Sequence, residues 1–237
     1  MNTIAWSTGG DYILSGSDDH YLCVTNPFEN KVKYKIKTSH ASNIFSAKYL
    51  PQTGDRQVVS CSASGRIIHT DLQRPEQTAA NIFDCIRDSV YDVQTIPNDP
   101  NSFLICSHDK TVRWYDLRVK QKCPRTDFSG ESCRSDILLA TDYPVTALAV
   151  NPRSAWQFAI GRSDSIVSVF DRRKLGTQSL GHEHPDAVNS LITQFAYNNV
   201  KTRNRITSLS YNDLGDNLLV SYSWDSIYLF DLNVSFF

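Results

Sequence analysis

The chain has 237 residues, of which 41% are hydrophobic, 21% charged and 11% aromatic, as in a folded globular protein and unlike a disordered or fibrous one. Its 24 Lys and Arg against 25 Asp and Glu give a formal net charge of -1, which lacks the basic excess of a protein that binds nucleic acid directly. The longest apolar runs are strand-sized and the N-terminus carries no signal-peptide pattern, so we expect an intracellular protein that does not enter a membrane.

One pattern occurs five times along the chain: a polar turn that usually carries an Asp, then an alternating strand that ends on Asp or Asn. This third strand of each repeat is expected over residues 17–26, 62–71, 107–116, 162–171 and 223–231, the last one residue shorter than the others. Second strands precede it at 12–15, 57–61, 103–106, 157–160 and 217–221, and first strands at 4–7, 44–49, 90–96, 145–150 and 206–211. Strands separated by Gly, Pro, Asn and Asp turns, without helical periodicity, predict an all-β protein of short antiparallel sheets.

The segment from Ser107 to Asp116 resembles the third strand of a WD40 repeat. The resemblance implies a WD40 β-propeller with five recognisable blades, at residues 1–38, 39–82, 83–140, 141–200 and 201–237. The chain begins at an inner strand and stops just after a third strand, and unpaired strand edges are a liability. We therefore expect the larger part of a seven-bladed ring, incomplete at the C-terminus, with a closed five-bladed ring as the alternative.

A full WD40 blade contains a buried network of a His before the first strand, the turn Asp, a Ser or Thr, and the Trp of the third strand. His40 is the sole His at the expected position, and its own repeat carries Ser64 in place of the turn Asp. Asp109 and Trp114 supply their half of the network without a His.

The cysteines indicate packing and not chemistry. The chain has 6 Cys without a Cys-x-x-Cys pair, which argues against a zinc site or a disulfide framework. Cys61 and Cys106 align with a position held elsewhere by Gly16, Gly161 and Tyr222, so we interpret them as small strand residues that pack between blades. In the last repeat, Trp224-Asp225 aligns with the turn His108-Asp109, and Phe230-Asp231 is the strand end.

The sequence lacks a recognisable set of catalytic residues, so we expect a non-enzymatic protein without cofactor or metal. The Gly pairs lack the Lys-Ser/Thr of a phosphate loop. His182-Glu183-His184 could chelate a metal, but a solvated loop is favoured because no partner ligand is near in sequence. Lys201, Arg203 and Arg205 are likewise interpreted as a solvated approach to a strand.

Two successive repeats end in the same motif, aromatic-Asp-x-Arg, made of Tyr115, Asp116 and Arg118 and of Phe170, Asp171 and Arg173. The shared register predicts that Arg118 and Arg173 lie on the same face of the ring, positioned by the two Asp residues. A guanidinium presents a rigid fork of donors that suits carboxylates or carbonyls of a partner. The alternative is that each Asp only binds local backbone amides and that each Arg is incidental.

The paired motif resembles that of the WD40 substrate receptors of cullin-4 RING ubiquitin ligases, the damaged-DNA-binding-protein- and cullin-4-associated factors. Residues 12–19, 41–48, 111–114 and 220–231 are further similar to the branch known as nuclear receptor interaction protein, with IQ and WD repeats. The resemblance implies that Tyr115, Asp116, Arg118, Phe170, Asp171 and Arg173 bind the damaged-DNA-binding-protein adaptor. In that branch a long insertion splits the propeller after five blades. The IQ motif is absent here, so calmodulin binding is not implied.

These observations predict a protein-interaction scaffold that acts as substrate receptor of a cullin-4 RING ubiquitin ligase, in the nucleus and cytoplasm. The opposite face, with Asp18, His108, Ser163 and Trp224, is expected to recruit an unidentified protein substrate, for which the branch suggests nuclear receptors. Trp224 is either a binding anchor or a cover for a gap in the ring. The alternative function is a general WD40 scaffold, or a nuclear receptor transcriptional coactivator, without a ligase role.

Overall fold

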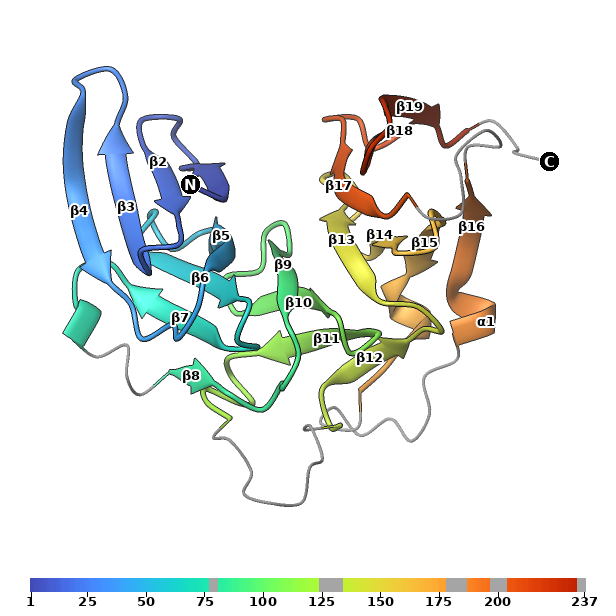
Figure 1. Cartoon of the computed structure of the whole chain (residues 1–237), viewed down its shortest axis with the longest axis horizontal. Coiled ribbons are helices and arrows are strands. Elements are labelled where there is room, and N and C mark those ends of the chain that lie inside the picture. Colours follow the sequence, from blue (N-terminus) through green and yellow to red (C-terminus); the bar gives the residue numbers. More distant parts are fainter. Residues whose placement is uncertain (77–80, 124–133, 178–186, 197–203, 234–237) are drawn as a thin grey trace. The chain divides into compact units, whose positions relative to one another are not determined.

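The computed structural model describes residues 1–76, 81–123, 134–177, 187–196 and 204–233 (Figure 1). Within these ranges the strands form five antiparallel sheets, and helical structure is limited to the four-residue α1 (Ala187–Ser190) and short 3-10 turns. The predicted all-β fold is therefore confirmed. No helix in the described ranges is long and apolar enough to cross a membrane.

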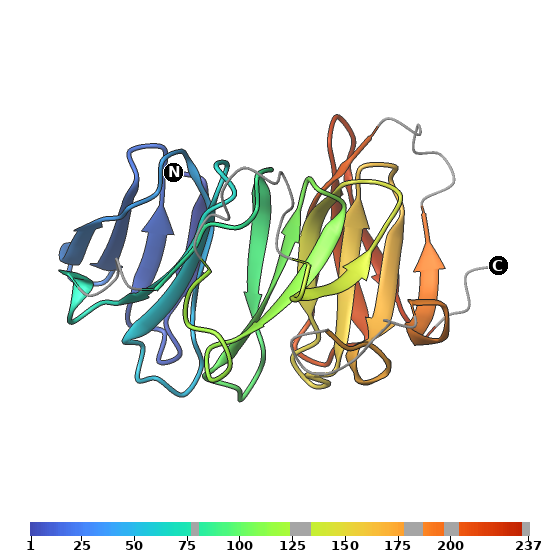
Figure 2. The ribbon, with the colours of Figure 1, turned by 90° about the horizontal axis from the view of Figure 1, so that it is seen from below.

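The chain forms two compact units, one of Met1–Ile105 with Tyr115–Arg134 and the other of Cys106–Trp114 with Ser135–Phe237. The first unit holds two four-stranded sheets in which strands that are consecutive in the chain pair with each other (Figure 2). The first sheet consists of β1 (Thr3–Trp6), β2 (Ile13–Gly16), β3 (Tyr21–Asn26) and β4 (Lys31–Lys37). The second consists of β5 (Ile44–Tyr49), β6 (Gln57–Ser62), β7 (Ile67–Asp71) and β8 (Ile82–Phe83).

The division between the units passes through the third sheet, which consists of β9 (Val90–Thr95), β10 (Ser102–Ser107), β11 (Thr111–Asp116) and β12 (Ile137–Ala140). The second unit continues with a sheet of β13 (Val145–Val150), β14 (Gln157–Arg162), β15 (Val167–Asp171) and β16 (Leu191–Phe195). The described part of the last sheet consists of β17 (Ile206–Tyr211), β18 (Asn217–Tyr222) and β19 (Ile227–Asp231). Five sheets thus match the five predicted repeats.

Four of the sheets contain a fourth strand that the sequence pattern does not predict. β4 carries Lys at every second position and is largely exposed, because it lies at the outer edge of its sheet. β8 has only two residues. β4 alternates Lys with Val, Tyr and Ile, but it lies outside the repeated motif from which the strands were predicted.

The last repeat has the same length as the others, so the prediction that it is one residue shorter was wrong. In β17, Ile206 pairs with Tyr222 of β18, just as Ile44 of β5 pairs with Ser62 of β6. Tyr222, and not Ser223, therefore begins the last turn. The Ser-Trp-Asp run imitates the Ser-His-Asp turn of the third repeat, and only strand pairing separates the two alignments.

The corrected register moves two residues. Ser221, and not Tyr222, occupies the position of Cys61, and Trp224 occupies the position of Ser64. Trp224 has a positive φ of 61°, a conformation that is uncommon for a bulky side chain. The other four turns have their positive φ one position later, at His20, Gly65, Lys110 and Ser165, so the last turn differs from them.

A small residue near the end of each second strand lets neighbouring sheets approach. We call this position the small-residue slot; it holds Gly16, Cys61, Cys106, Gly161 and Ser221. A Cβ atom on Gly161 would lie 2.4 Å from Cγ2 of Ile206 in the next sheet, and one on Gly16 would lie 2.7 Å from Cγ2 of Ile44. Cys61 and Cys106 are fully buried, and burial raises the pKa of the Cys61 thiol. The interpretation of both as packing residues is confirmed.

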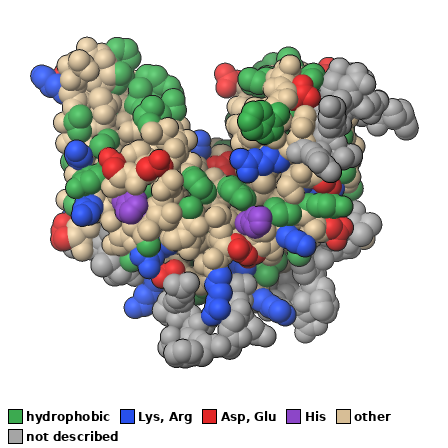
Figure 3. All heavy atoms as spheres, in the orientation of Figure 1, with side chains coloured by type: hydrophobic (Ala, Val, Ile, Leu, Met, Phe, Trp, Pro, Cys, Tyr) green, Lys and Arg blue, Asp and Glu red, His purple; other side chains and the backbone are tan. Residues whose placement is uncertain are grey.

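One face of the last sheet is exposed and apolar. Leu219, Ile227 and Leu229 are 44%, 62% and 68% exposed, and hydrophobic side chains are visible at the surface over this sheet (Figure 3). Strand register equates them with residues of the preceding sheet that are fully buried, namely Ala159, Val167 and Val169. These positions thus normally contact a neighbouring sheet. The seven-bladed ring itself stays a prediction.

His40 forms part of the expected blade network. Its Nε2 lies 2.8 Å from Oγ of Ser60 in β6, and the side chain is buried. Ser64 reaches only the hydroxyl of Ser62, at 3.0 Å. Burial, with a contribution from the Arg66 cation, lowers the pKa of His40 to about 3. The folded chain therefore keeps this imidazole neutral.

Replacement of Gly161 by Ala should destabilise the chain. The new methyl group meets Ile206 of the next sheet, and overpacking of this kind costs about 1–3 kcal/mol. Urea unfolding of the parent and the variant measures the difference. Gly9→Ala is the control, because its Cβ would meet only the Asp11 side chain, at 3.2 Å. An equal, small effect of both substitutions would contradict the role of the slot.

The free energy of unfolding should decrease as the pH is lowered, and part of this decrease should depend on His40. The unfolded chain binds a proton near the ordinary His pKa of about 6.5, whereas the folded chain resists protonation until about pH 3. The contribution is complete above about pH 6.5 and is lost below it, by up to about 1.4 kcal/mol per pH unit. Urea unfolding from pH 7.5 to 4.5 should show a shallower decline for His40→Gln than for the parent. His108→Gln, a change at an exposed histidine, is the control.

Candidate functional site

Each third strand ends in the same local turn. The side chain of the terminal Asp or Asn accepts a hydrogen bond from the backbone N–H two residues later, at 2.9 or 3.0 Å. The five acceptor and donor pairs are Asn26 with Phe28, Asp71 with Gln73, Asp116 with Arg118, Asp171 with Arg173, and Asp231 with Asn233. This turn explains why every repeat ends on Asp or Asn, since short polar side chains bind nearby backbone amides.

In the first unit, the Arg118 side chain folds back onto the same carboxylate that binds its own backbone amide. Nε of Arg118 donates to Oδ1 of Asp116 at 2.9 Å, and Nη2 donates to Oδ2 at 2.6 Å. The Asp116 side chain is only 10% exposed, whereas that of Arg118 is 64% exposed. The carboxylate therefore holds one edge of the guanidinium and leaves the rest of the group at the surface.

In the second unit, Arg173 repeats this geometry. Its Nε donates to Oδ1 of Asp171 at 3.1 Å and its Nη2 to Oδ2 at 2.8 Å. The exposed fractions are 62% for Arg173 and 8% for Asp171, close to those of the first motif. The guanidinium also lies over the Trp156 ring, 4.0 Å from its centroid, which restricts Arg173 further. Trp156 has no signature in the sequence, because it lies in a turn outside the repeated motif.

Both ion pairs stay charged across the physiological range. The hydrogen bond from the Arg118 side chain and that from its backbone amide lower the pKa of Asp116. Arg173 acts on Asp171 in the same way, and the pKa of each arginine is raised in return. Each Asp thus binds a backbone amide and also positions an exposed Arg, and the role of these arginines in binding a partner stays a prediction.

The aromatic residues of the two motifs lie in the core, which corrects their expected place on the binding surface. Tyr115 is 1% exposed, with its ring 4.8 Å from that of Phe83. Phe170 is 6% exposed and stacks on Phe158 at 5.7 Å. Their side chains point inward because they alternate with the Asp that follows. They pack in the core and anchor the strand end.

The residues predicted for the opposite face lie in the turns that join second and third strands. Asp18 and His108 are exposed and Ser163 is half-buried. Asp18 accepts a hydrogen bond from Nδ2 of Asn2 at 2.6 Å. Trp224 is 98% exposed, which leaves its ring without the packing of a residue that covers a gap.

The other half of the predicted blade network takes a different form. Asp109 pairs with the fully buried Arg113 at 2.7 Å instead of with a His. The Arg172 guanidinium lies over the Trp114 ring, with its Cζ 3.6 Å from the ring centroid. A buried arginine thus replaces the usual imidazole in this repeat.

Several sequence candidates carry no site in the part of the chain that the structure describes. His182-Glu183-His184, Lys201, Arg203 and Cys133 lie outside the described residues. The described cysteines form no disulfide, and no three described His, Cys, Asp or Glu residues cluster as metal ligands. The Arg205 carbonyl accepts the Ser223 amide at 2.9 Å, so its backbone belongs to the last turn.

Comparisons with known proteins agree with the repeats. The family described as WD domain, G-beta repeat matches residues 1–26 and 80–116. DDB1- and CUL4-associated factor 6 of Homo sapiens is 42% identical over 98% of the chain, which covers 26% of that protein. WD repeat protein iqw1 of Schizosaccharomyces pombe is 33% identical over 73% of the chain and 22% of its own length. The chain thus spans about a quarter of the length of these curated relatives.

A solved structure supports the fold alone. The β-propeller domain of Myceliophteria thermophila Cps50 (Swd1) superposes with a TM-score of 0.71 at 17% sequence identity. The match covers 97% of this chain and 64% of that one. The predicted β-propeller class is confirmed.

Replacement of Asp171 by Ala should lower the free energy of unfolding by about 1 kcal/mol, because it removes the cap of the 3-10 turn at Arg172–Lys174. Asp171→Asn should cost less, since the amide oxygen still accepts the Arg173 backbone N–H. Urea unfolding measures both, with the exposed Asp142→Ala as control. If Asp171→Ala is as stable as the parent, the carboxylate is not needed to hold the turn.

Proposed function

The chain carries WD40 repeats and is 42% identical over nearly its whole length to DDB1- and CUL4-associated factor 6, and on this premise we propose that it is a substrate receptor of a cullin-4 ubiquitin ligase. In this role the chain binds DDB1 through Arg118 and Arg173 and presents a protein substrate to the assembled ligase. The name of the human relative states its association with DDB1 and CUL4. The proposal extends that association to this chain.

The observation that carries the proposal is the repeated Asp-Arg geometry. Arg118 and Arg173 are held by two-point contacts to Asp116 and Asp171, yet more than half of each arginine side chain remains exposed. An exposed ion pair between neighbours contributes little to stability on its own. Its occurrence at the same position of two sheets is better explained by a partner that uses the ordered guanidinium.

The substrate surface is proposed to lie at the turns between second and third strands, with Asp18, His108, Ser163 and Trp224. Trp224 is the strongest anchor among them because its whole ring is exposed, and Trp is enriched at the centres of binding interfaces. Nuclear receptors are candidate substrates, and the protein would act in the nucleus and cytoplasm without contacting nucleic acid itself.

The WD40 likeness and the names of the relatives point to a non-catalytic scaffold. Ubiquitin transfer would belong to the other subunits of the ligase. A transcriptional coactivator role would use the same scaffold, but no described residue favours it over substrate reception.

Binding to purified DDB1 tests the proposal. The double variant Arg118→Ala with Arg173→Ala should bind at least tenfold more weakly than the parent in biolayer interferometry, and each single variant should show an intermediate loss. Arg→Lys at both positions keeps the charge but removes the fork of donors, so it should restore little of the binding.

Arg162→Ala is the matched control. Arg162 forms the same two-point contact with Asp164, at 3.0 and 2.7 Å, but at the other end of β14. Thermal unfolding of each variant confirms that it is folded. Undiminished DDB1 binding by the folded double variant would remove the main support for the receptor function.

A further inference from the structure

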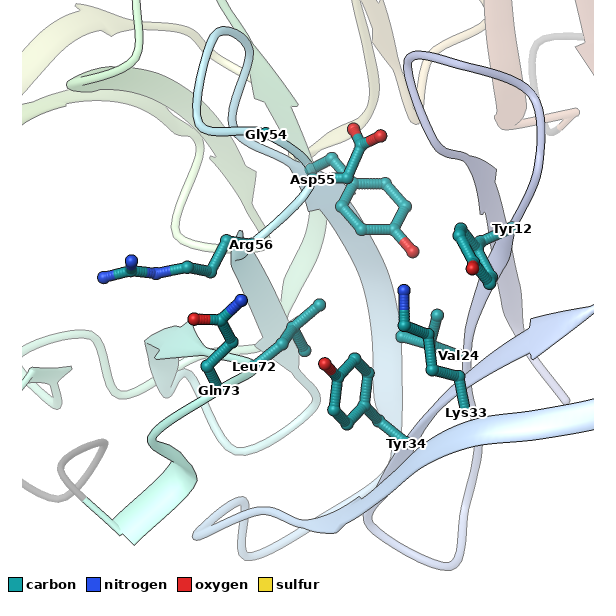
Figure 4. Close-up of a pocket in the computed structure, with 10 residues that line it drawn as sticks. Tyr12, Val24, Lys33, Tyr34, Gly54, Asp55, Arg56, Leu72 and Gln73 are labelled. Atoms are coloured by element: carbon teal, nitrogen blue, oxygen red, sulfur yellow. The ribbon is translucent and has the colours of Figure 1, made fainter.

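A small pocket lies in the first unit, between its first and second sheets (Figure 4). Its volume is about 110 Å³, far below the roughly 300–1,000 Å³ typical of drug-sized ligands. The first sheet contributes Tyr12, Val24, Lys33 and Tyr34, and the second contributes Tyr49, Gly54, Asp55, Arg56, Leu72 and Gln73. The pocket therefore suits a head group and not a whole cofactor.

An ammonium group from the chain itself already lies against the aromatic wall. Nζ of Lys33 is 3.9 Å from the ring centroid of Tyr12 and 5.7 Å from that of Tyr34. Figure 4 shows Tyr12, Lys33 and Tyr34 on one side of the pocket, opposite Asp55, Arg56 and Gln73. Because Lys33 is an exposed residue of the edge strand β4, water can replace these contacts at little cost.

One residue of the pocket lining has an unused polar group. Tyr49 is 8% exposed, and its hydroxyl has no hydrogen-bond partner among the described residues. Burial, with the nearby Asp55 carboxylate, raises the pKa of this phenol, so it stays protonated and neutral. A buried hydroxyl without a partner costs free energy, which a ligand with an N–H donor would recover.

The wall and the rim both favour positive charge. Tyrosine faces attract cations, and aromatic enclosures of this kind bind alkylammonium groups. The Asp55 carboxylate adds a negative charge at the rim, held in place by the Thr8 backbone N–H at 2.9 Å. The one arginine of the lining, Arg56, is already paired with Asp71 at 2.9 Å.

We propose that this pocket binds the ammonium head of a lysine side chain presented by a partner protein, and that Lys33 is the internal group which the partner's lysine displaces. The partner lysine enters over Tyr12 and Tyr34 and donates to the Tyr49 hydroxyl oxygen. Lys33 then moves into solvent. The lining includes neither Arg118 nor Arg173, and the inference does not depend on the DDB1 proposal.

The site is tested by titrating the full chain with Nα-acetyl-Nε-dimethyl-lysine amide and recording NMR spectra of its 13C-labelled tyrosine rings. Lys33→Ala should bind this probe at least fivefold more tightly than the parent, with shifts at Tyr12, Tyr34 and Tyr49. The uncharged analogue that carries Nε-acetyl-lysine should bind at least tenfold more weakly. Equal binding of the charged and acetylated probes, or no gain from Lys33→Ala, would overturn the proposal.

Conservative changes at Tyr12 separate recognition from folding. In the Lys33→Ala background, Tyr12→Phe keeps an aromatic face and should retain binding within twofold, whereas Tyr12→Leu keeps apolar bulk and should lose at least fivefold. Lys35→Ala is the matched control. Lys35 lies on the same strand as Lys33, and its Nζ is 5.0 Å from the centroid of the Tyr21 ring, but neither Lys35 nor Tyr21 lines the pocket. A gain in affinity from Lys35→Ala would show that any loss of positive charge suffices, and it would refute displacement.

Discussion

The structure depends on the burial of one sheet face against the next. A sheet of three or four short strands cannot bury its apolar face alone, so each repeat needs its neighbour. The small-residue slot is where this need is strictest, since Gly161 leaves no room for a Cβ beside Ile206. The slot admits Gly, Ser or Cys, which accounts for two cysteines that could otherwise be mistaken for reactive groups.

The same packing determines what the surface can offer. In the first four sheets the inner residues of the third strand lie largely in the core, so the groups that these strands offer to a partner are those just beyond the strand end. Asp116 and Asp171 first serve the backbone as turn acceptors, and the arginines two residues later use the carboxylates that the turn has already oriented. Two sheets thus gain an ordered guanidinium from a turn that all five sheets share.

Much of the fold follows from the sequence, for identifiable reasons. Strands that recur at the same place in each repeat, such as β5, β13 and β17, are predicted at their observed bounds, because the repeated motif locates them. The edge strands β4 and β8 lie outside that repeated motif and are not predicted, although β4 alternates Lys with apolar residues. The register of the last repeat depends on the pairing of Ile206 with Tyr222, which a local comparison of turns does not reveal. At the site, the motif identifies the Asp and Arg residues correctly, but burial of Tyr115 and the contact of Arg173 with Trp156 require the folded structure.

The closeness of each Asp-Arg pair has a kinetic consequence. A guanidinium that shares its charge with a carboxylate 2.6 or 2.8 Å away acts at a distance as a small dipole, whose field fades well within the Debye length of about 8 Å. With a formal net charge of only -1, the chain adds no strong overall attraction. A partner that docks on these arginines would therefore arrive without electrostatic steering, at roughly the 10⁵–10⁶ M⁻¹s⁻¹ of neutral surfaces. Selectivity would then depend mainly on the dissociation rate of the partner, because the fit between the two surfaces acts only after they are in contact.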